Sequence, residues 1–175
     1  MSGSFSRRLC RSWSRCIALI LVFICVFSGT RLVLSEESPA ESSVESQKEN
    51  GRADLDRAVE LKLSARTFTD LGEVIRLCEE ALKKGLSSED TDFAKHLLGA
   101  TRIQRGMMIG QTLLSGLTID RNWPAFRTLA LEDLEKGLAT EPDQPEAWLL
   151  VSRLQSLPGG DRKKALEAAT KVTEL

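Results

Sequence analysis

Few residues of this chain are of the types that carry out acid–base or nucleophilic chemistry. The 175 residues include one histidine, four cysteines and no tyrosine. His96 has no acidic residue or cysteine at metal-ligand spacing, so we expect a structural or surface imidazole. The carboxylate pairs Glu79-Glu80 and Glu132-Asp133 are expected on solvent-exposed helix faces beside lysines, where no apolar pocket raises a pKa. The sequence therefore predicts no catalytic residue, no metal site and no cofactor, and a protein that is not an enzyme.

Two short motifs that resemble phosphate-binding or nucleophile motifs lack the context that these need. The segment 158–161 (PGGD) has no following Lys-Ser/Thr and no preceding strand, so it is predicted to be a turn. Ser115-Gly116 has no strand before it and no helix directly after it, as a nucleophile elbow requires. Neither motif indicates catalysis.

The charge distribution argues against a nucleic-acid partner. The formal net charge is −1. Residues 1–35 hold five basic and no acidic residues, which leaves 19 basic and 25 acidic residues in the remainder, a net charge of −6. Arg102, Arg105 and Arg121 form no dense basic stripe, and Trp123 and Trp148 are expected to be packing anchors rather than base-stacking platforms.

Residues 1–35 are typical of an export signal. The basic, serine-rich stretch 1–15 precedes an apolar run of eleven residues, 17–27. A membrane-spanning helix needs about 20 apolar residues, whereas the apolar region of a signal peptide needs about 7–15. Small or modest side chains up to Ser35 favour cleavage there. The predicted location is therefore periplasmic or extracellular.

Three alternatives concern the same segment. An uncleaved anchor over residues 16–34 would tether the protein to the membrane, with the Arg31 side chain reaching to the boundary. The pair Arg7-Arg8 resembles a twin-arginine signal, but the residues after it and the strongly apolar run favour the general secretory route. Cys25 follows the bulky pair Phe23-Ile24, which disfavours a lipoprotein signal.

The cysteines support this division. Cys10, Cys16 and Cys25 all lie in the predicted signal, so a cleaved chain keeps only Cys78, and one thiol forms no internal disulfide. Cys78 occupies an apolar helical stripe and is predicted to be a small core residue.

Residues 36–52 are rich in Glu and Ser with one large aliphatic residue, and we expect a disordered linker there.

From residue 53 onward the apolar periodicity is helical throughout, so the fold class is all-α with a domain over 53–175. Asp70 and Glu73 have the spacing of a capping box, Ser87 or Ser88 caps the third helix, and Asp143 and Asp161 cap the last two. Gly106 and Gly110 are expected to break or bend the third helix, whose inward residues are Phe93, Leu97, Ala100 and Ile103. The expected helices are 54–68, 70–85, 89–114, 124–140, 145–157 and 161–175.

Six helices with short connections predict antiparallel hairpins stacked side by side, and an internal repeat supports this arrangement. Residues 130–138 align with residues 165–173 at an offset of 35, and residues 74–82 share their apolar and small positions. A helical repeat of this length is typical of a solenoid.

The repeat resembles the tetratricopeptide repeat (TPR), most specifically over residues 129–175 and more loosely over about 120 residues in all. The last unit has a bulky residue at the fourth position, an aliphatic–small pair and small residues on its second helix: Ala147, Trp148, Val151, Ser152, Ala165, Ala169 and Val172. The preceding unit supplies Leu98-Gly99, Ala130, Leu134, Gly137 and the terminating Pro142. The chain departs from the family at Gln155, where tyrosine is preferred, and by about nineteen extra residues between Gly99 and Ala130. The resemblance implies a short right-handed solenoid of about three hairpins.

By the same resemblance, the chain is a protein–protein interaction scaffold without catalysis. TPR arrays hold a peptide or protein segment in a concave groove lined by the first helix of each pair. The residues that would line this groove are Phe93, His96, Ala100, Glu146, Leu149, Arg153 and Ser156. Arg153 is the residue best suited to bind a carboxylate of the partner.

Two other hypotheses stay open. The chain could be the N-terminal helical segment of a larger exported enzyme, for example a thioredoxin-like one, whose catalytic part is absent from these residues. It could also form a homo-oligomer through its last helix, which has no polar capping helix after it, as repeat arrays normally need. A further coding segment would favour the first hypothesis, and a concentration-dependent dimer the second.

Overall fold

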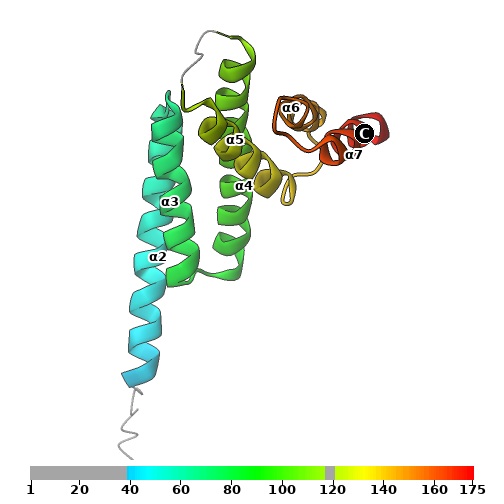
Figure 1. Cartoon of the computed structure of the whole chain (residues 1–175). Coiled ribbons are helices and arrows are strands. Elements are labelled where there is room, and N and C mark those ends of the chain that lie inside the picture. Colours follow the sequence, from blue (N-terminus) through cyan, green and yellow to red (C-terminus); the bar gives the residue numbers. More distant parts are fainter. Residues whose placement is uncertain (1–38, 117–120) are drawn as a thin grey trace, which may run out of the picture. The chain divides into compact units, whose positions relative to one another are not determined.

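The computed structural model describes the backbone of residues 39–116 and 121–175, with side chains from Lys48 onward. This part of the chain forms six α-helices and no strand (Figure 1), so the predicted all-α fold class is confirmed there. The predicted export segment, residues 1–35, lies outside the described residues. The helices are α2 (Pro39–Ser64), α3 (Phe68–Lys84), α4 (Ser88–Leu114), α5 (Trp123–Leu138), α6 (Pro145–Gln155) and α7 (Arg162–Glu174).

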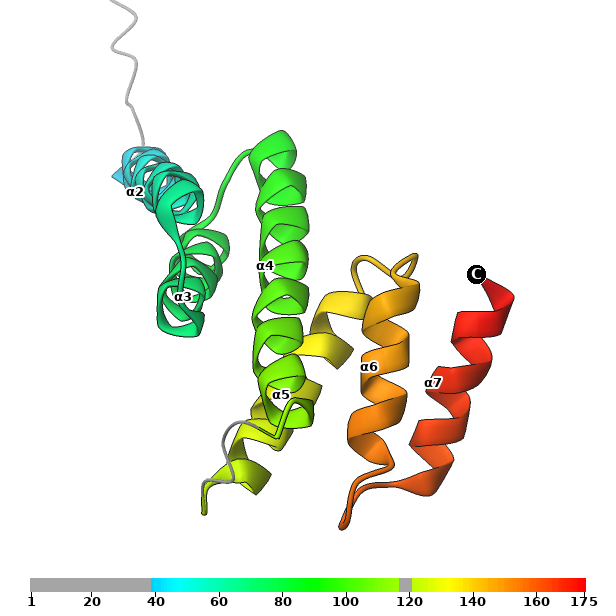
Figure 2. The same cartoon turned by 90° about the horizontal axis from the view of Figure 1, so that it is seen from above.

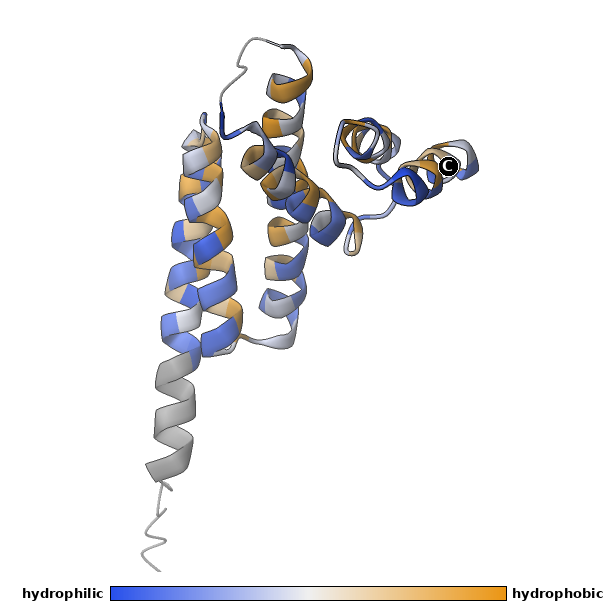
Figure 3. Ribbon diagram, viewed as in Figure 1, coloured by the Kyte–Doolittle hydropathy of each residue, from blue (hydrophilic) through white to orange (hydrophobic). Residues whose placement is uncertain are grey.

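Each helix packs against the next one in the chain, and α4 also contacts α6. Figure 2 shows α4 between the α2–α3 pair and the α6–α7 pair. Hydrophobic and hydrophilic residues lie on different faces of the helices (Figure 3), as expected for amphipathic helices. One core cluster, which includes Ala58, Val74, Cys78 and Leu98, joins α2, α3 and α4. Another, which includes Leu134 and Leu154, joins α4, α5, α6 and α7.

The first helix begins well before the predicted residue 54, because α2 starts at Pro39. Residues 39–52, which we predicted as part of a disordered linker, are therefore helical. At the C-terminal end of this stretch, contacts with residues distant in the sequence explain why the chain is helical rather than disordered. A Cβ atom on Gly51 would lie 2.4 Å from the carbonyl oxygen of Gly85, so the two backbones touch there. The Arg52 guanidinium lies 2.8 Å from the Asp90 carboxylate at the start of α4.

The caps of two helices differ from the prediction. The capping box of α3 is formed by Thr67 and Asp70, three residues earlier than the predicted pair of Asp70 and Glu73. Hydrogen bonds from the backbone N–H groups of Arg66 and Thr67 hold the pKa of the Asp70 carboxyl below its ordinary value. Helix α6 has Gln144 rather than Asp143 as its N-cap residue, without a side-chain hydrogen bond.

The other predicted caps are confirmed. Ser87 accepts a hydrogen bond from the backbone N–H of Asp90 at the start of α4. Asp161 accepts hydrogen bonds from the backbone N–H groups of Lys163 and Lys164 at the start of α7. Side-chain acceptors at these positions satisfy amide groups that the helix itself leaves unpaired.

Helix α4 runs without interruption through Gly106 and Gly110, so the predicted possibility of a break at these glycines is wrong. Both glycines are buried because neighbouring helices approach them closely: a Cβ on Gly106 would lie 2.9 Å from the carbonyl oxygen of Ala130, and one on Gly110 would lie 2.9 Å from a methyl group of Leu150. They are contact points between helices rather than hinges.

The prediction that Phe93 and Ala100 point inward is also wrong, since both are exposed. Among the residues described, no helix is long and apolar enough to cross a membrane.

Candidate functional site

The seven residues predicted to line a groove are all exposed. Three of them lie on α4, three on α6 and one at the C-cap of α6: Phe93, His96 and Ala100; Glu146, Leu149 and Arg153; and Ser156. Helices α4 and α6 contact each other, so the residues lie on two neighbouring elements. Their role in binding stays a prediction.

Helix α4 has three distinct faces, and the predicted residues on it occupy the one against which none of the other described helices packs. One face packs toward α3 through Ala94 and Leu98. A second face meets α5 and α6 through Gly106 and Gly110. The third face carries the exposed side chain of Ala100 and continues toward the helix end as a shallow hollow of about 380 Å³. This hollow is lined by Ala100, Ile103, Gln104, Met107, Met108 and Gln111.

Helix α6 is buried on one side and open on the other. Ala147, Leu150 and Leu154 belong to the core, whereas Leu149 and Arg153 are exposed. Within the described part of the chain, Arg153 forms no ion pair. Its guanidinium is therefore available to a carboxylate from outside, which it can bind through two parallel N–H···O hydrogen bonds.

Two of the predicted residues already have partners within the chain. The Nδ1 atom of His96 lies 2.5 Å from Oε1 of Glu141, in the connection between α5 and α6. The Ser156 hydroxyl donates a hydrogen bond to the carbonyl oxygen of Ser152, 2.8 Å away. Because both side chains already form hydrogen bonds within the chain, Leu149 and Arg153 are better placed to contact a ligand.

A polar cleft of about 330 Å³ lies between α3, α4 and α5, and the sequence analysis missed it. Asp133, which we expected on a solvent-exposed face, is buried, and Arg105 binds it with Nε at 2.6 Å and Nη2 at 2.7 Å. Arg102 forms an ion pair with Glu79 across α3 and α4, and Lys136 forms one with Glu132 on α5. Because the cations are paired with neighbouring carboxylates, the cleft offers little free charge to a ligand. Its ion pairs instead connect the three helices.

The described residues offer little material for catalysis. Across residues 48–116 and 121–175, no group of three His, Cys, Asp or Glu side chains is placed to hold a metal ion. The predicted burial of Cys78 is confirmed. Burial raises the pKa of its thiol to about 11, and the Glu79 carboxylate adds to this shift. The thiol is therefore protonated at neutral pH and shielded from reagents.

We expect the Cys78 thiol to resist alkylation in the folded protein and to react once the protein unfolds, because the thiolate is the reactive form. The experiment compares labelling by iodoacetamide with and without urea, with mass spectrometry of the peptide that contains Cys78. At least a tenfold faster reaction in urea is expected. Equal rates would contradict the burial of this residue.

Comparison of the chain with protein-family models, with curated proteins and with solved structures finds no match. The functional conclusion therefore depends on the geometry of the described residues and on the sequence pattern.

Proposed function

We propose that this protein is a binding module of paired helices, similar to a TPR array, that holds an extended segment of a partner protein. The segment lies along the open faces of α4 and α6. The module has no catalytic activity of its own. Residues 1–35 direct it out of the cytoplasm or tether it to the membrane.

The order of helix packing supports the repeat arrangement. Helices α2 and α3, α4 and α5, and α6 and α7 pack as pairs, and α3 with α4 and α5 with α6 connect one pair to the next. In the proposed right-handed solenoid, the first helices of successive pairs lie side by side. Helices α4 and α6 pack in this way, whereas α2 and α4 are joined through long side chains such as those of Arg52 and Asp90 rather than by close helix packing. Small residues at the crossings, Gly99 against Thr140 and Gly137 against Ile103, allow the two helices of the middle pair to approach closely.

The single observation that carries the function is the hollow on the open face of α4, a helix that also contacts α6. The hollow offers apolar contacts through Met107 and an amide group through Gln111, whereas the Gln104 amide oxygen already accepts a hydrogen bond from Lys62 of α2. On α6, Leu149 adds an exposed apolar side chain and Arg153 an unpaired cation. These features match an extended peptide with one apolar side chain and one carboxylate, either acidic or C-terminal.

The proposal predicts that Arg153→Ala weakens peptide binding. Extended peptides are selected from a displayed library against the full chain, and the affinity of the selected peptides is then measured by calorimetry. Loss of a charge-assisted hydrogen bond of about 1.5–3 kcal/mol corresponds to about a tenfold to hundredfold weaker affinity for Arg153→Ala. Leu149→Ala is expected to weaken binding by about tenfold, since it removes buried apolar surface.

The matched control is Arg162→Ala, which removes another exposed arginine, at the start of α7 and away from the proposed site. This variant should bind the selected peptides as the unaltered chain does. Equal affinities for Arg153→Ala, Leu149→Ala and the unaltered chain would refute the proposed binding face.

A further inference from the structure

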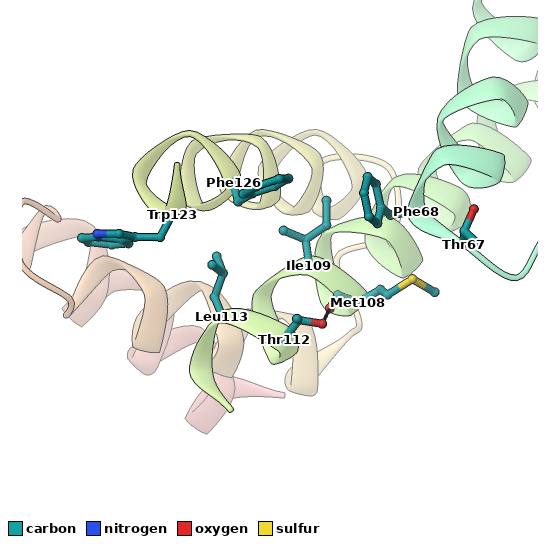
Figure 4. A pocket seen from close by; sticks show the side chains of 8 residues that line it. All are labelled: Thr67, Phe68, Met108, Ile109, Thr112, Leu113, Trp123 and Phe126. Atoms are coloured by element: carbon teal, nitrogen blue, oxygen red, sulfur yellow. Dashed lines mark hydrogen bonds between the residues drawn. The ribbon is translucent and has the colours of Figure 1, made fainter. Parts of the chain in front are cut away.

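A second cavity, of about 480 Å³, lies on a different side of α4 and has apolar walls (Figure 4). It is bounded by the start of α3, the last two turns of α4 and the start of α5. The lining residues are Thr67, Phe68, Met108, Ile109, Thr112, Leu113, Trp123 and Phe126, and all of them lie in the described part of the chain. Met108 is the one residue that also borders the hollow on the open face of α4.

The cavity exists because α4 is longer than the helix that covers it. Helix α4 has 27 residues and α3 has 17, so α4 extends about 15 Å beyond its partner at a rise of about 1.5 Å per residue. Leu98 packs in the core against α3, and Ile109 lies eleven residues, or about three turns, further along the same face. The apolar face of α4 thus continues past the start of α3 at Phe68, beyond the part of α4 that α3 covers.

Three of the eight residues that line the cavity are aromatic: Phe68, Trp123 and Phe126. Ile109 forms a buried part of the wall, with an exposed fraction of 5%. Phe68 of α3 and Phe126 of α5 contact each other edge to face, with ring centroids 6.3 Å apart. Figure 4 shows Trp123 and Phe68 at opposite ends of the row formed by Leu113 and Ile109. Flat or chain-like apolar groups fit between such rings.

The two hydroxyl groups that line the cavity already have hydrogen bonds. The Thr67 hydroxyl oxygen accepts one from the backbone N–H of Asp70, and the Thr112 hydroxyl donates one to the carbonyl oxygen of Met108. None of the eight lining residues carries a charge. Arg127 stacks on Trp123 but does not line the cavity; its two Nη atoms donate to the carbonyl oxygens of Pro158 and Gly159, whereas its Nε atom is buried and has no hydrogen-bond partner. The lining residues themselves offer no charge to compensate an ion for the hydration that it loses on entering the cavity.

We propose that this cavity binds a small neutral molecule with an aromatic or hydrocarbon body. Its volume falls within the range of about 300–1,000 Å³ that is typical of small-molecule sites, and sites between packed helices are common. A ligand of this kind would cover apolar surface of Phe68, Leu113 and Trp123 that water now contacts. A charged amphiphile with the same hydrocarbon body binds less well, because the cavity offers its charge no partner.

The test uses N-phenyl-1-naphthylamine, a neutral apolar dye whose fluorescence increases in an apolar site. Titration of the full chain is expected to give saturable binding to one site. Thr112→Trp, which adds a bulky ring from an exposed position on the wall, should weaken this binding at least tenfold. Phe68→Ala, which removes one aromatic wall, should weaken it by a similar factor. The matched control is Leu166→Ala, since Leu166 is an exposed apolar side chain (70%) on α7 that lines neither the cavity nor the proposed groove. It should leave the affinity unchanged.

A competition experiment distinguishes the chemistry of the ligand. Decanol should displace the dye, and decanoate at neutral pH should do so at least tenfold less effectively. Circular dichroism checks that each variant is folded, and if Phe68→Ala is not, Thr112→Trp alone decides. Equal dye affinity in Thr112→Trp and the unaltered chain would overturn the proposal, as would equal competition by the two amphiphiles. Dye binding that disappears as the protein dimerises at higher concentration would also overturn it, because a second copy would then cover the cavity.

Discussion

Replacement of Arg105 by methionine is expected to lower the free energy of unfolding by about 3–5 kcal/mol, a large fraction of the about 5–15 kcal/mol that is typical of a folded domain. The variant leaves the Asp133 carboxylate buried without its partner, since the Asp133 side chain is 4% exposed and Arg105 supplies both of its hydrogen bonds at 2.6 and 2.7 Å. The Arg105 side chain also packs against α3, since its Nη1 atom would lie 2.9 Å from a Cβ atom added to Gly72. Urea denaturation followed by circular dichroism measures the loss.

Two controls separate a buried ion pair from an ordinary one. The double variant Arg105→Met/Asp133→Leu removes both charges, and it should recover most of the lost stability, because apolar replacement of a buried pair is often neutral or stabilising. Lys136→Ala breaks the exposed pair with Glu132 on the same helix, where both side chains are about half exposed, and should cost about 0.3–0.5 kcal/mol. A loss in Arg105→Met as small as that in Lys136→Ala would contradict the burial of the Asp133 charge.

Local sequence was sufficient to predict the helices but not all of their ends. Pro124, Asp161 and Ser87 mark helix starts through their own side chains, and the structure places helix starts at or beside each of them. The helical state of residues 51 and 52 could not be predicted from local sequence, because Gly51 packs against Gly85 and Arg52 binds Asp90, both more than 30 positions away, in addition to the local pair of Arg52 with Asp56. Composition alone describes such a stretch as a polar linker.

The polar cleft and the apolar cavity show the same limit. Asp133 follows Glu132 and precedes Lys136 by three residues, so its local pattern is that of a solvent-exposed face. Its partner Arg105 is 28 residues away and becomes visible only when α4 and α5 pack. The cavity did have a signal in the sequence, since the predicted helices 70–85 and 89–114 already differ by ten residues in length. The longer helix must extend beyond the shorter one.

All seven residues that were predicted to line a groove lie at exposed positions. Their helical spacing on α4 and α6 follows from the TPR resemblance and from the 3.6-residue period. The period alone does not separate the open face of α4 from its packed faces. For this reason, Phe93 and Ala100 were expected both to point into the core and to line a groove. Both residues are exposed, which contradicts the first expectation and is compatible with the second.

Replacement of Gly137 by alanine is expected to destabilise the protein, although alanine is the better helix former by about 1 kcal/mol. A Cβ at this position in α5 would lie 2.6 Å from Cγ1 of Ile103, 2.9 Å from the carbonyl oxygen of Gly99 and 3.1 Å from the backbone nitrogen of Ile103. Two of these three atoms belong to the backbone of α4, which cannot move aside without separating the helices. Overpacking of this kind costs about 1–3 kcal/mol, or more where the backbone must shift, and therefore exceeds the gain in helix propensity.

Gly110→Ala is the matched comparison, because Gly110 is also a buried glycine at a helix crossing. The three atoms nearest to its added Cβ, at 2.9–3.2 Å, belong to the side chains of Leu150 and Leu154, which can adjust their rotamers. We expect Gly110→Ala to change the free energy of unfolding by less than about 1 kcal/mol, and Gly137→Ala to lower it by about 1–2 kcal/mol. Thermal and urea denaturation of both variants measure the difference. If Gly137→Ala were as stable as the unaltered chain, the helices α4 and α5 could not cross as closely as described, and the small-residue contact that supports the repeat arrangement would be lost with it.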